Sequence, residues 1–336
     1  MVYINTNKNR KRYIDIIKGL SIISIAFIHY EDGIINYNTY VFISLYMVSI
    51  FYFCVGWLDG LIEHNITYKE LARKRWKQIG KPYIYWTLII LTFDLCLVCF
   101  RFYNFSYILQ ELYKSLTLRG VGTLWFLPAL FGGEMIWYYI KKRGWHIKLL
   151  VLGLTLLYQF IYNQLFSDLE GQLIKIINAP FRTLYSILNA WIFIAIGYYS
   201  YKILKSNRLP QYSLFLISLV IMCTIYIFSI QIKYPFISQF FECIGIMLMF
   251  YSCQDLKILN YFEYWGRNSL CLMVTHYSII LVICKIIIQN ILGLTFHGWI
   301  TIFAFCMSMI FQYIINESIN KYFPFLLGKN NIRYRK

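Results

Sequence analysis

Three ionisable residues, Asp15, Lys18 and His29, interrupt the first long apolar stretch of the chain, residues 12–30. A histidine can take a proton from a hydroxyl group, a lysine can hold an anion or stabilise developing negative charge, and an aspartate can orient either one. A charge inside a bilayer costs roughly 2.5 kcal/mol or more, so such residues usually mark a functional site. This pattern indicates acid–base chemistry at membrane depth.

An α-helix would place these residues along one face. At ~100° per residue, Lys18 and His29 are separated by three turns plus ~20°, and by ~16 Å along the axis. Asp15 lies one turn before Lys18. The face would then carry a polar group near each end and an apolar middle.

A simpler interpretation of the same residues is also open. Lys18 could extend to the membrane surface and pair with Asp15, while His29 could lie at the opposite interface beside Glu31 and Asp32. The spacing alone does not choose between a catalytic and an interfacial role.

The whole chain has the composition of a membrane protein. Its 336 residues are 59% hydrophobic and 14% charged, whereas soluble domains are about 25% charged. A span needs ~20 mostly apolar residues, and such blocks recur from end to end, whereas barrel strands would be ~10 residues of alternating polarity. We therefore predict an all-α fold, a polytopic integral membrane helical bundle.

About ten transmembrane helices are predicted, in a single domain over residues 1–336 with short basic tails at 1–12 and 320–336. Alternate connecting segments are rich in Lys and Arg, which is typical of the cytoplasmic side and predicts that both termini are cytoplasmic. The segment with Arg101, Lys114 and Arg119 fits this alternation least well. The predicted spans are roughly 13–30, 41–57, 83–100, 124–140, 147–164, 183–201, 212–230, 237–253, 269–289 and 298–319.

The basic residues behind the net charge of +17 are expected to contact lipid headgroups. On a soluble protein such a charge would indicate nucleic acid, but here the charges lie in short gaps between apolar blocks. Anionic lipids are therefore the expected partners, and nucleic acid is not. The nine cysteines are scattered, and the spacing of Cys96 and Cys99 within an apolar block favours simple packing over a metal or redox site.

Five motifs together resemble the membrane acyltransferase-3 family. The stretch DIIKG (15–19) followed by His29 has the family's spacing of acid, basic residue, glycine and histidine. The order and extent of the motifs also match, and the nearest resemblance is to the fucose 4-O-acetylase-like branch, which modifies sugars. The other four motifs are SIFYFCVGW, RKRWKQIGKPY, TLWFLPALF and WGRNSLCLMVTH. In the first of these four, Val55 stands where the family usually has serine.

The resemblance implies transfer of an acyl group, usually acetyl from acetyl-CoA, to a sugar hydroxyl of a cell-surface polysaccharide or its lipid-linked precursor. His29 would be the general base or a transient acyl carrier. Lys18 would be a cation near the cytoplasmic donor or on a CoA phosphate, and Asp15 would pair with it. The Tyr- and Ile-rich composition suggests a bacterial protein, so the expected location is the cell membrane.

The basic segment before the third span is expected to hold the phosphates of acetyl-CoA, because guanidinium and ammonium groups suit phosphate oxygens. Arg75 is the best match to the family's arginine, and Arg73, Lys77 and Lys81 accompany it. Contact with lipid headgroups is the alternative.

Three residues are expected at the acceptor. Trp125 could stack on a sugar ring or anchor the chain at the interface. Asn268 could contact the acceptor or cap the ninth span, and His276 could be a buried histidine with a neighbouring partner or a second catalyst. Glu134 and Glu242 are intramembrane carboxylates without an assigned partner.

A transporter or flippase for a lipid-linked sugar is the alternative from another class. Buried charges in ten spans fit it, but the inverted repeats and paired broken helices of transporters are not found. A third interpretation is an enzyme similar to the membrane-bound O-acyltransferases, a separate polytopic family. Those enzymes rely on a histidine and an asparagine in later spans, whereas His29 is in the first span. The resemblance further implies a donor pocket and an acceptor pocket that meet within the membrane.

Overall fold

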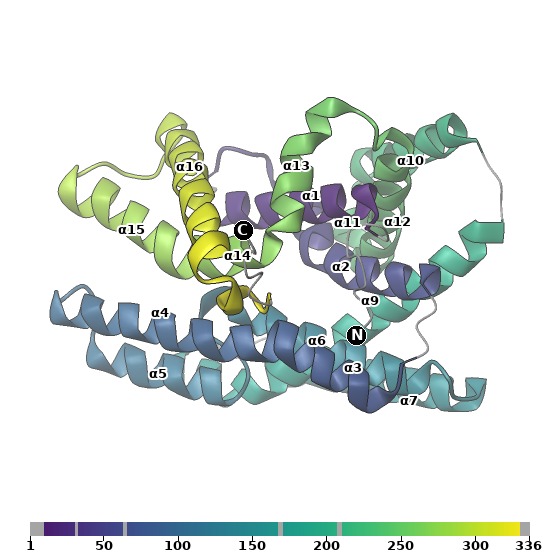
Figure 1. The fold of residues 1–336 in the computed structure, drawn as a ribbon, viewed down its shortest axis with the longest axis horizontal. Helices are drawn as coiled ribbons and strands as arrows, with labels where there is room; N and C mark the ends of the chain where they lie inside the picture. The colour runs from purple at the N-terminus through teal and green to yellow at the C-terminus, as the bar shows by residue number, and fades with distance from the viewer. Residues whose placement is uncertain (1–9, 31–32, 63–65, 167–170, 207–209, 330–336) are drawn as a thin grey trace, which may run out of the picture.

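A computed structural model describes residues 10–30, 33–62, 66–166, 171–206 and 210–329. Every regular element within these ranges is a helix (Figure 1), which confirms the all-α prediction. Eight helical segments are long and apolar enough to cross a membrane, and they correspond to eight of the predicted spans. They are α1 (Arg12–Tyr30), α2 (Tyr37–Leu61), the run from α3 (Tyr68–Arg75) through η1 (Trp76–Gly80) to α4 (Lys81–Cys99), α7 (Trp145–Phe166), α9 (Ala179–Ser206), α12 (Pro235–Cys253), the run from α14 (Ser269–Thr275) through η4 (His276–Leu281) and α15 (Val282–Lys285) to η5 (Ile286–Ile291), and α16 (Trp299–Tyr322).

The other two predicted spans are shorter than expected. α6 (Phe126–Ile140) has 15 residues because the chain before it forms the 3-10 turn η2 (Gly122–Trp125), and α10 (Gln211–Ile227) has 17. At 1.5 Å per residue α6 is about 22 Å long, less than the ~30 Å of a bilayer core. The count of ten spans therefore remains a prediction for these two helices.

The longest helix that the sequence did not predict has 12 residues. α5 (Phe105–Leu116) occupies the segment between the third and fourth predicted spans and runs beside α4 (Figure 1). Its apolar residues recur three or four positions apart, which is the pattern of an amphipathic helix. The remaining short elements are α8 (Gln172–Ile177), α11 (Ile230–Lys233), η3 (Lys257–Leu259), α13 (Asn260–Arg267) and η6 (Pro324–Leu327).

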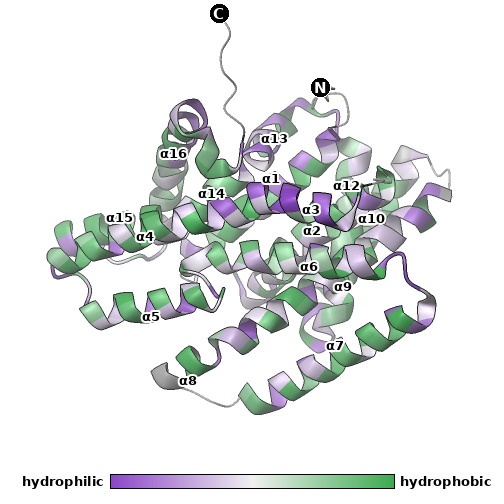
Figure 2. Cartoon of the chain, turned by 60° about the horizontal axis from the view of Figure 1, so that its bottom comes forward, coloured by the Kyte–Doolittle hydropathy of each residue, from purple (hydrophilic) through white to green (hydrophobic). Residues whose placement is uncertain are grey.

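Burial differs sharply between the helices. In α1 61% of the apolar window is buried inside the protein, and in α7 only 6%. Figure 2 shows hydrophobic residues along the outward helices, including α7. So much exposed apolar surface is unusual for a soluble protein but is expected next to lipid. Among the charged residues of α1, Asp15 is buried in the protein, and Arg12 and Lys18 are half-buried.

Glycines allow α1 and α13 to pack in backbone contact. A Cβ atom at Gly19 would collide with the carbonyl of Phe262, and one at Gly266 would collide with the carbonyl of Asp15. Small residues at helix crossings let helices approach closely in membranes. Two of the motifs, DIIKG and WGRNSLCLMVTH, thus meet in space.

The same arrangement occurs between α2 and α9. Gly56 lies against the carbonyl of Ile194, and Gly197 lies against that of Phe53. These two helix crossings, each with a pair of glycines, bring α1, α2, α9 and α13 into the centre of the bundle. The largest hydrophobic core cluster is found there.

Candidate active site

Two adjoining cavities lie within the bundle. The first, called the Lys18 cavity, has a volume of about 370 Å³ and is lined by α1, α2, α3, η1, α6 and α14. The second, the His29 cavity, has about 740 Å³ and reaches from α1 and α2 to α4, α5 and η4. Phe51, Phe126 and Met273 line both cavities and form a shared wall between them.

The Lys18 cavity contains an ion pair and an additional cation. Arg75 Nη2 lies 2.6 Å from Glu134 Oε1, and the Glu134 side chain is only 4% exposed. This gives Glu134 the partner that the sequence did not identify. Lys18 lines the same cavity and forms no ion pair within the described residues. Glu242, the other intramembrane carboxylate, is buried in α12 outside the lining of both cavities.

The other expected donor residues do not line these cavities. Arg73, Lys77 and Lys81 are exposed on the segment from α3 to the start of α4. Only Arg75 of this group reaches the Lys18 cavity. Phosphate binding by the other three remains a prediction, with lipid headgroups as the alternative.

His29 is half-buried and lies in a group of three aromatic rings. Its ring centroid is 4.6 Å from that of Tyr277 and 5.4 Å from that of His276. The sequence analysis missed Tyr277, although it adjoins His276 in the chain. Glu31 and Asp32, the partners in the interfacial interpretation, lie outside the described residues.

The buried His276 has a defined tautomer. Its Nδ1 lies 2.8 Å from the carbonyl oxygen of Leu272, and a carbonyl only accepts, so Nδ1 donates. Nε2 then carries a lone pair, and it is buried without a partner among the described residues. His276 therefore has both a backbone partner and an unused acceptor near His29.

The segment before α6 forms the facing wall of the His29 cavity. Trp125 lines the cavity, and Thr123 Oγ1 donates to the carbonyl of Met273 at 2.6 Å. Gly122 has a φ of +54°, and a Cβ atom there would meet the side chains of Ser278 and Tyr277. Glycine is thus required where this wall approaches the neighbours of His29.

Two carboxylates in the His29 cavity were missed. Asp94 of α4 is 2% exposed, and its Oδ2 has no hydrogen-bond partner among the described residues. Glu111 of α5 is paired with Lys114 at 2.6 Å. Asp94 interrupts a predicted span as Asp15 does, so the same signal could have identified it, whereas Glu111 required the recognition of α5.

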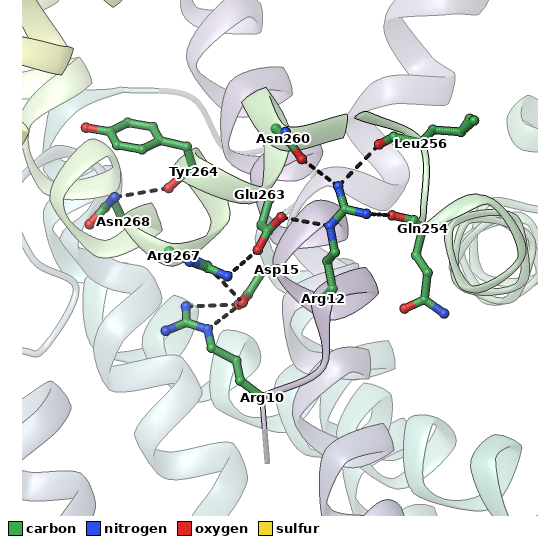
Figure 3. Close-up of polar contacts among 10 residues, drawn as sticks. All are labelled: Arg10, Arg12, Asp15, Gln254, Leu256, Asn260, Glu263, Tyr264, Arg267 and Asn268. Atoms are coloured by element: carbon green, nitrogen blue, oxygen red, sulfur yellow. Dashed lines mark hydrogen bonds and ion pairs between the residues drawn. The ribbon is translucent and has the colours of Figure 1, made fainter. Parts of the chain in front are cut away.

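Asp15 does not have the partner expected from the sequence. We expected a pair with Lys18, but Asp15 pairs with Arg10 and, at 3.7 Å, with Arg267 of α13 (Figure 3). Three residues along a helix differ by ~300°, so Asp15 and Lys18 point ~60° apart. Asp15 faces α13, whereas Lys18 faces the cavity.

Asp15 belongs to a chain of alternating charges between α1 and α13. Arg267 also pairs with Glu263, and Glu263 accepts from Arg12 Nε at 2.8 Å (Figure 3). Asn268 lies next to this cluster at the end of α13, where it bonds to the carbonyl of Tyr264 and receives a hydrogen bond from Asn320. Asn268 lines neither cavity, and its contact with an acceptor remains a prediction.

The sequence matches the family described as an acyltransferase domain over residues 11–317. The chain belongs to this acyltransferase family. The match confirms the resemblance to the acyltransferase-3 family over nearly the whole chain and includes both cavities, while the fucose 4-O-acetylase-like branch remains a prediction. No curated protein and no solved structure matches the chain.

In this acyltransferase, one helix supplies a residue to each cavity. Lys18 and His29 lie on α1 at ~16 Å of axial separation and line different cavities. The two side chains are therefore too far apart to act on the same reacting atom. The apolar helices and the family together indicate a multi-pass membrane acyltransferase.

Proposed function

We propose that this acyltransferase moves an acetyl group from acetyl-CoA to a sugar hydroxyl of a cell-surface polysaccharide or its lipid-linked precursor. The observation that carries the proposal is the meeting of a cationic cavity and a histidine cavity at one shared wall. Membership of the acyltransferase family favours group transfer over transport of a lipid-linked sugar.

The Lys18 cavity is the proposed donor site. Glu134 already neutralises Arg75, so Lys18 is the cation left to meet a phosphate of CoA. The pantetheine arm would extend from there toward Phe51, Phe126 and Met273. This orientation requires the Lys18 end of α1 to face the cytoplasm, in agreement with the predicted topology.

The His29 cavity is the proposed site of chemistry. The acceptor oxygen attacks the thioester carbonyl carbon while His29 accepts the hydroxyl proton. The tetrahedral intermediate then expels the CoA thiolate, which takes up the proton from the imidazolium, leaving an ester and CoA. General base catalysis of this kind contributes about 10²–10⁴ in rate.

Residues in the His29 cavity, and His276 beside His29, would orient the reactants. The lone pair on His276 Nε2 would accept a hydrogen bond from His29 and fix its ring, as second partners of functional histidines do. Asp94 would accept hydrogen bonds from sugar hydroxyls, and Trp125 would contact the sugar ring.

Replacement of the base is the direct test of this proposal. We expect His29→Ala to lower transfer of radiolabel from acetyl-CoA to membrane glycan by about 10²-fold or more. Protein level should not change. His146→Ala is the matched control, because His146 is exposed at the start of α7 and lines neither cavity. Unchanged transfer in His29→Ala would refute the assignment, and unlabelled glycan with the wild-type protein would favour the transporter.

A further inference from the structure

The His29 cavity carries more positive than negative side chains. Glu111 and Lys114 neutralise one another, and Asp94 is the other carboxylate of the lining. Three cations remain, and none of them forms an ion pair within the described residues. These are Arg119, Arg182 and Lys285.

Two of these cations, Arg119 and Arg182, lie near one another in this cavity. Arg119 is half-buried, and its Cζ lies 5.1 Å from the ring centroid of Trp125. Arg182 is in the first turn of α9. Thr183 Oγ1 donates to the carbonyl of Thr117 at 3.1 Å, which holds this turn against the loop that carries Arg119.

The guanidinium group of Arg119 is charged at neutral pH. Burial, and next the charge of Arg182, lower the pKa of Arg119 to about 10. Arg119 thus remains protonated several pH units above neutrality. Arg119 is half-buried and Arg182 is exposed. Neither has an ion-pair partner among the described residues, so a ligand that supplies negative charge would relieve the repulsion between the two cations. Guanidinium groups bind the paired oxygens of carboxylates and phosphates with matched geometry.

The loop that carries Arg119 also approaches His29, the proposed base. It continues through Gly122, which lies against Tyr277, the ring nearest to His29. Trp125, three residues after Gly122, lines the same cavity. An acceptor held by the arginines would therefore lie along the wall that faces His29.

We propose that Arg119 and Arg182 bind an oxyanion of the acceptor, so that the acetylated molecule is an anionic glycan. The oxyanion is a carboxylate or phosphate on the sugar chain, or the phosphate of its carrier lipid. The inference rests on the proposed acetyl transfer and adds the chemical class of the acceptor.

The test follows the charge of the labelled product. Membranes that contain the protein and its native acceptor are incubated with radiolabelled acetyl-CoA, and the glycan is separated by anion exchange before and after mild acid release from lipid. We expect the label in the retained fraction before release. Retention after release places the anion on the sugar, and its loss on release places it on the carrier lipid. Label in the unretained fraction before release would overturn the proposal.

Variants then connect the charge to the two arginines. Arg119→Gln and Arg182→Gln should each lower labelling about tenfold at limiting acceptor, because each removes a charge-assisted contact. Acetyl-CoA binding by the purified variants should match the wild type, which separates loss of the acceptor from misfolding. Arg101→Gln is the control, since Arg101 is an exposed arginine of the loop before α5 and lines neither cavity.

The failures are distinguishable. Unchanged labelling in both variants would overturn the anion site and leave acetyl transfer intact. Absence of label in every fraction would instead contradict the proposed function, and the inference with it.

Discussion

At the residue scale, a buried charge in this protein is explained by its neighbours rather than by its position in the sequence. Asp15 and Lys18 are one helical turn apart, yet one joins the contact with α13 and the other lines a cavity. Helical periodicity predicted that both lie on one face of the helix, but it cannot say which helix packs against each. Their separate roles emerged only from the packing.

The ion pair between Arg75 and Glu134 leads to a double-mutant prediction. Arg75→Gln should destabilise the protein by about 3–5 kcal/mol, because it leaves a buried carboxylate without its partner. Adding Glu134→Gln should recover much of that loss. Thermal unfolding of the purified variants in detergent measures both effects.

The same pair of variants separates stability from donor binding. If Arg75 also contacts acetyl-CoA, the apparent KM for acetyl-CoA stays raised in the double variant after stability is recovered. A double variant with normal stability and a normal KM would assign Arg75 to structure alone. Arg143→Gln, at an exposed position on the loop before α7 outside both cavities, is the control.

Sequence reasoning located a few of the residues that line the cavities, mainly charged and aromatic ones. Lys18, Arg75, His29 and Trp125 line them, and His276 lies beside His29. The missed residues Asp94 and Glu111 come from helices whose facing surfaces are set by tertiary contacts.

At the element scale, glycine determines how closely the central helices pack. Gly19→Ala and Gly266→Ala should each lower stability by about 1–3 kcal/mol or more, because the new methyl group would enter a backbone carbonyl of the facing helix. The readout is the unfolding temperature of the purified protein.

Gly153→Ala supplies the matched control for this prediction. Gly153 lies in α7 with no atom within 4 Å of the added Cβ, and alanine exceeds glycine in helix propensity by about 1 kcal/mol. It should be neutral or stabilising. Equal unfolding temperatures for all three variants would contradict the packing argument.

Hydropathy identified the long spans correctly but not the shorter helices. It cannot show that Leu124 and Trp125 leave the helix for a 3-10 turn, because the close approach of Gly122 to Tyr277 imposes this turn from outside the segment. The amphipathic α5 was missed because it is too short and too polar on one face to register as a span.

At the scale of the whole molecule, α1 lines two chemically different cavities that share one wall. The family match covers both. The resemblance implied pockets that meet within the membrane, and the structure contains adjoining cavities with Lys18 in one and His29 in the other. Only three-dimensional packing could identify Phe51, Phe126 and Met273 as the wall, since they come from three different helices.

A cryo-EM structure of the protein with a non-hydrolysable acetyl-CoA analogue tests this account most directly. We expect the CoA phosphates at the mouth of the Lys18 cavity near Lys18 and Arg75, with the acetyl group at the wall formed by Phe51, Phe126 and Met273, directed toward His29. An analogue bound with its acetyl group outside the bundle, or at a part of the Lys18 cavity remote from Phe51, Phe126 and Met273, would contradict the account.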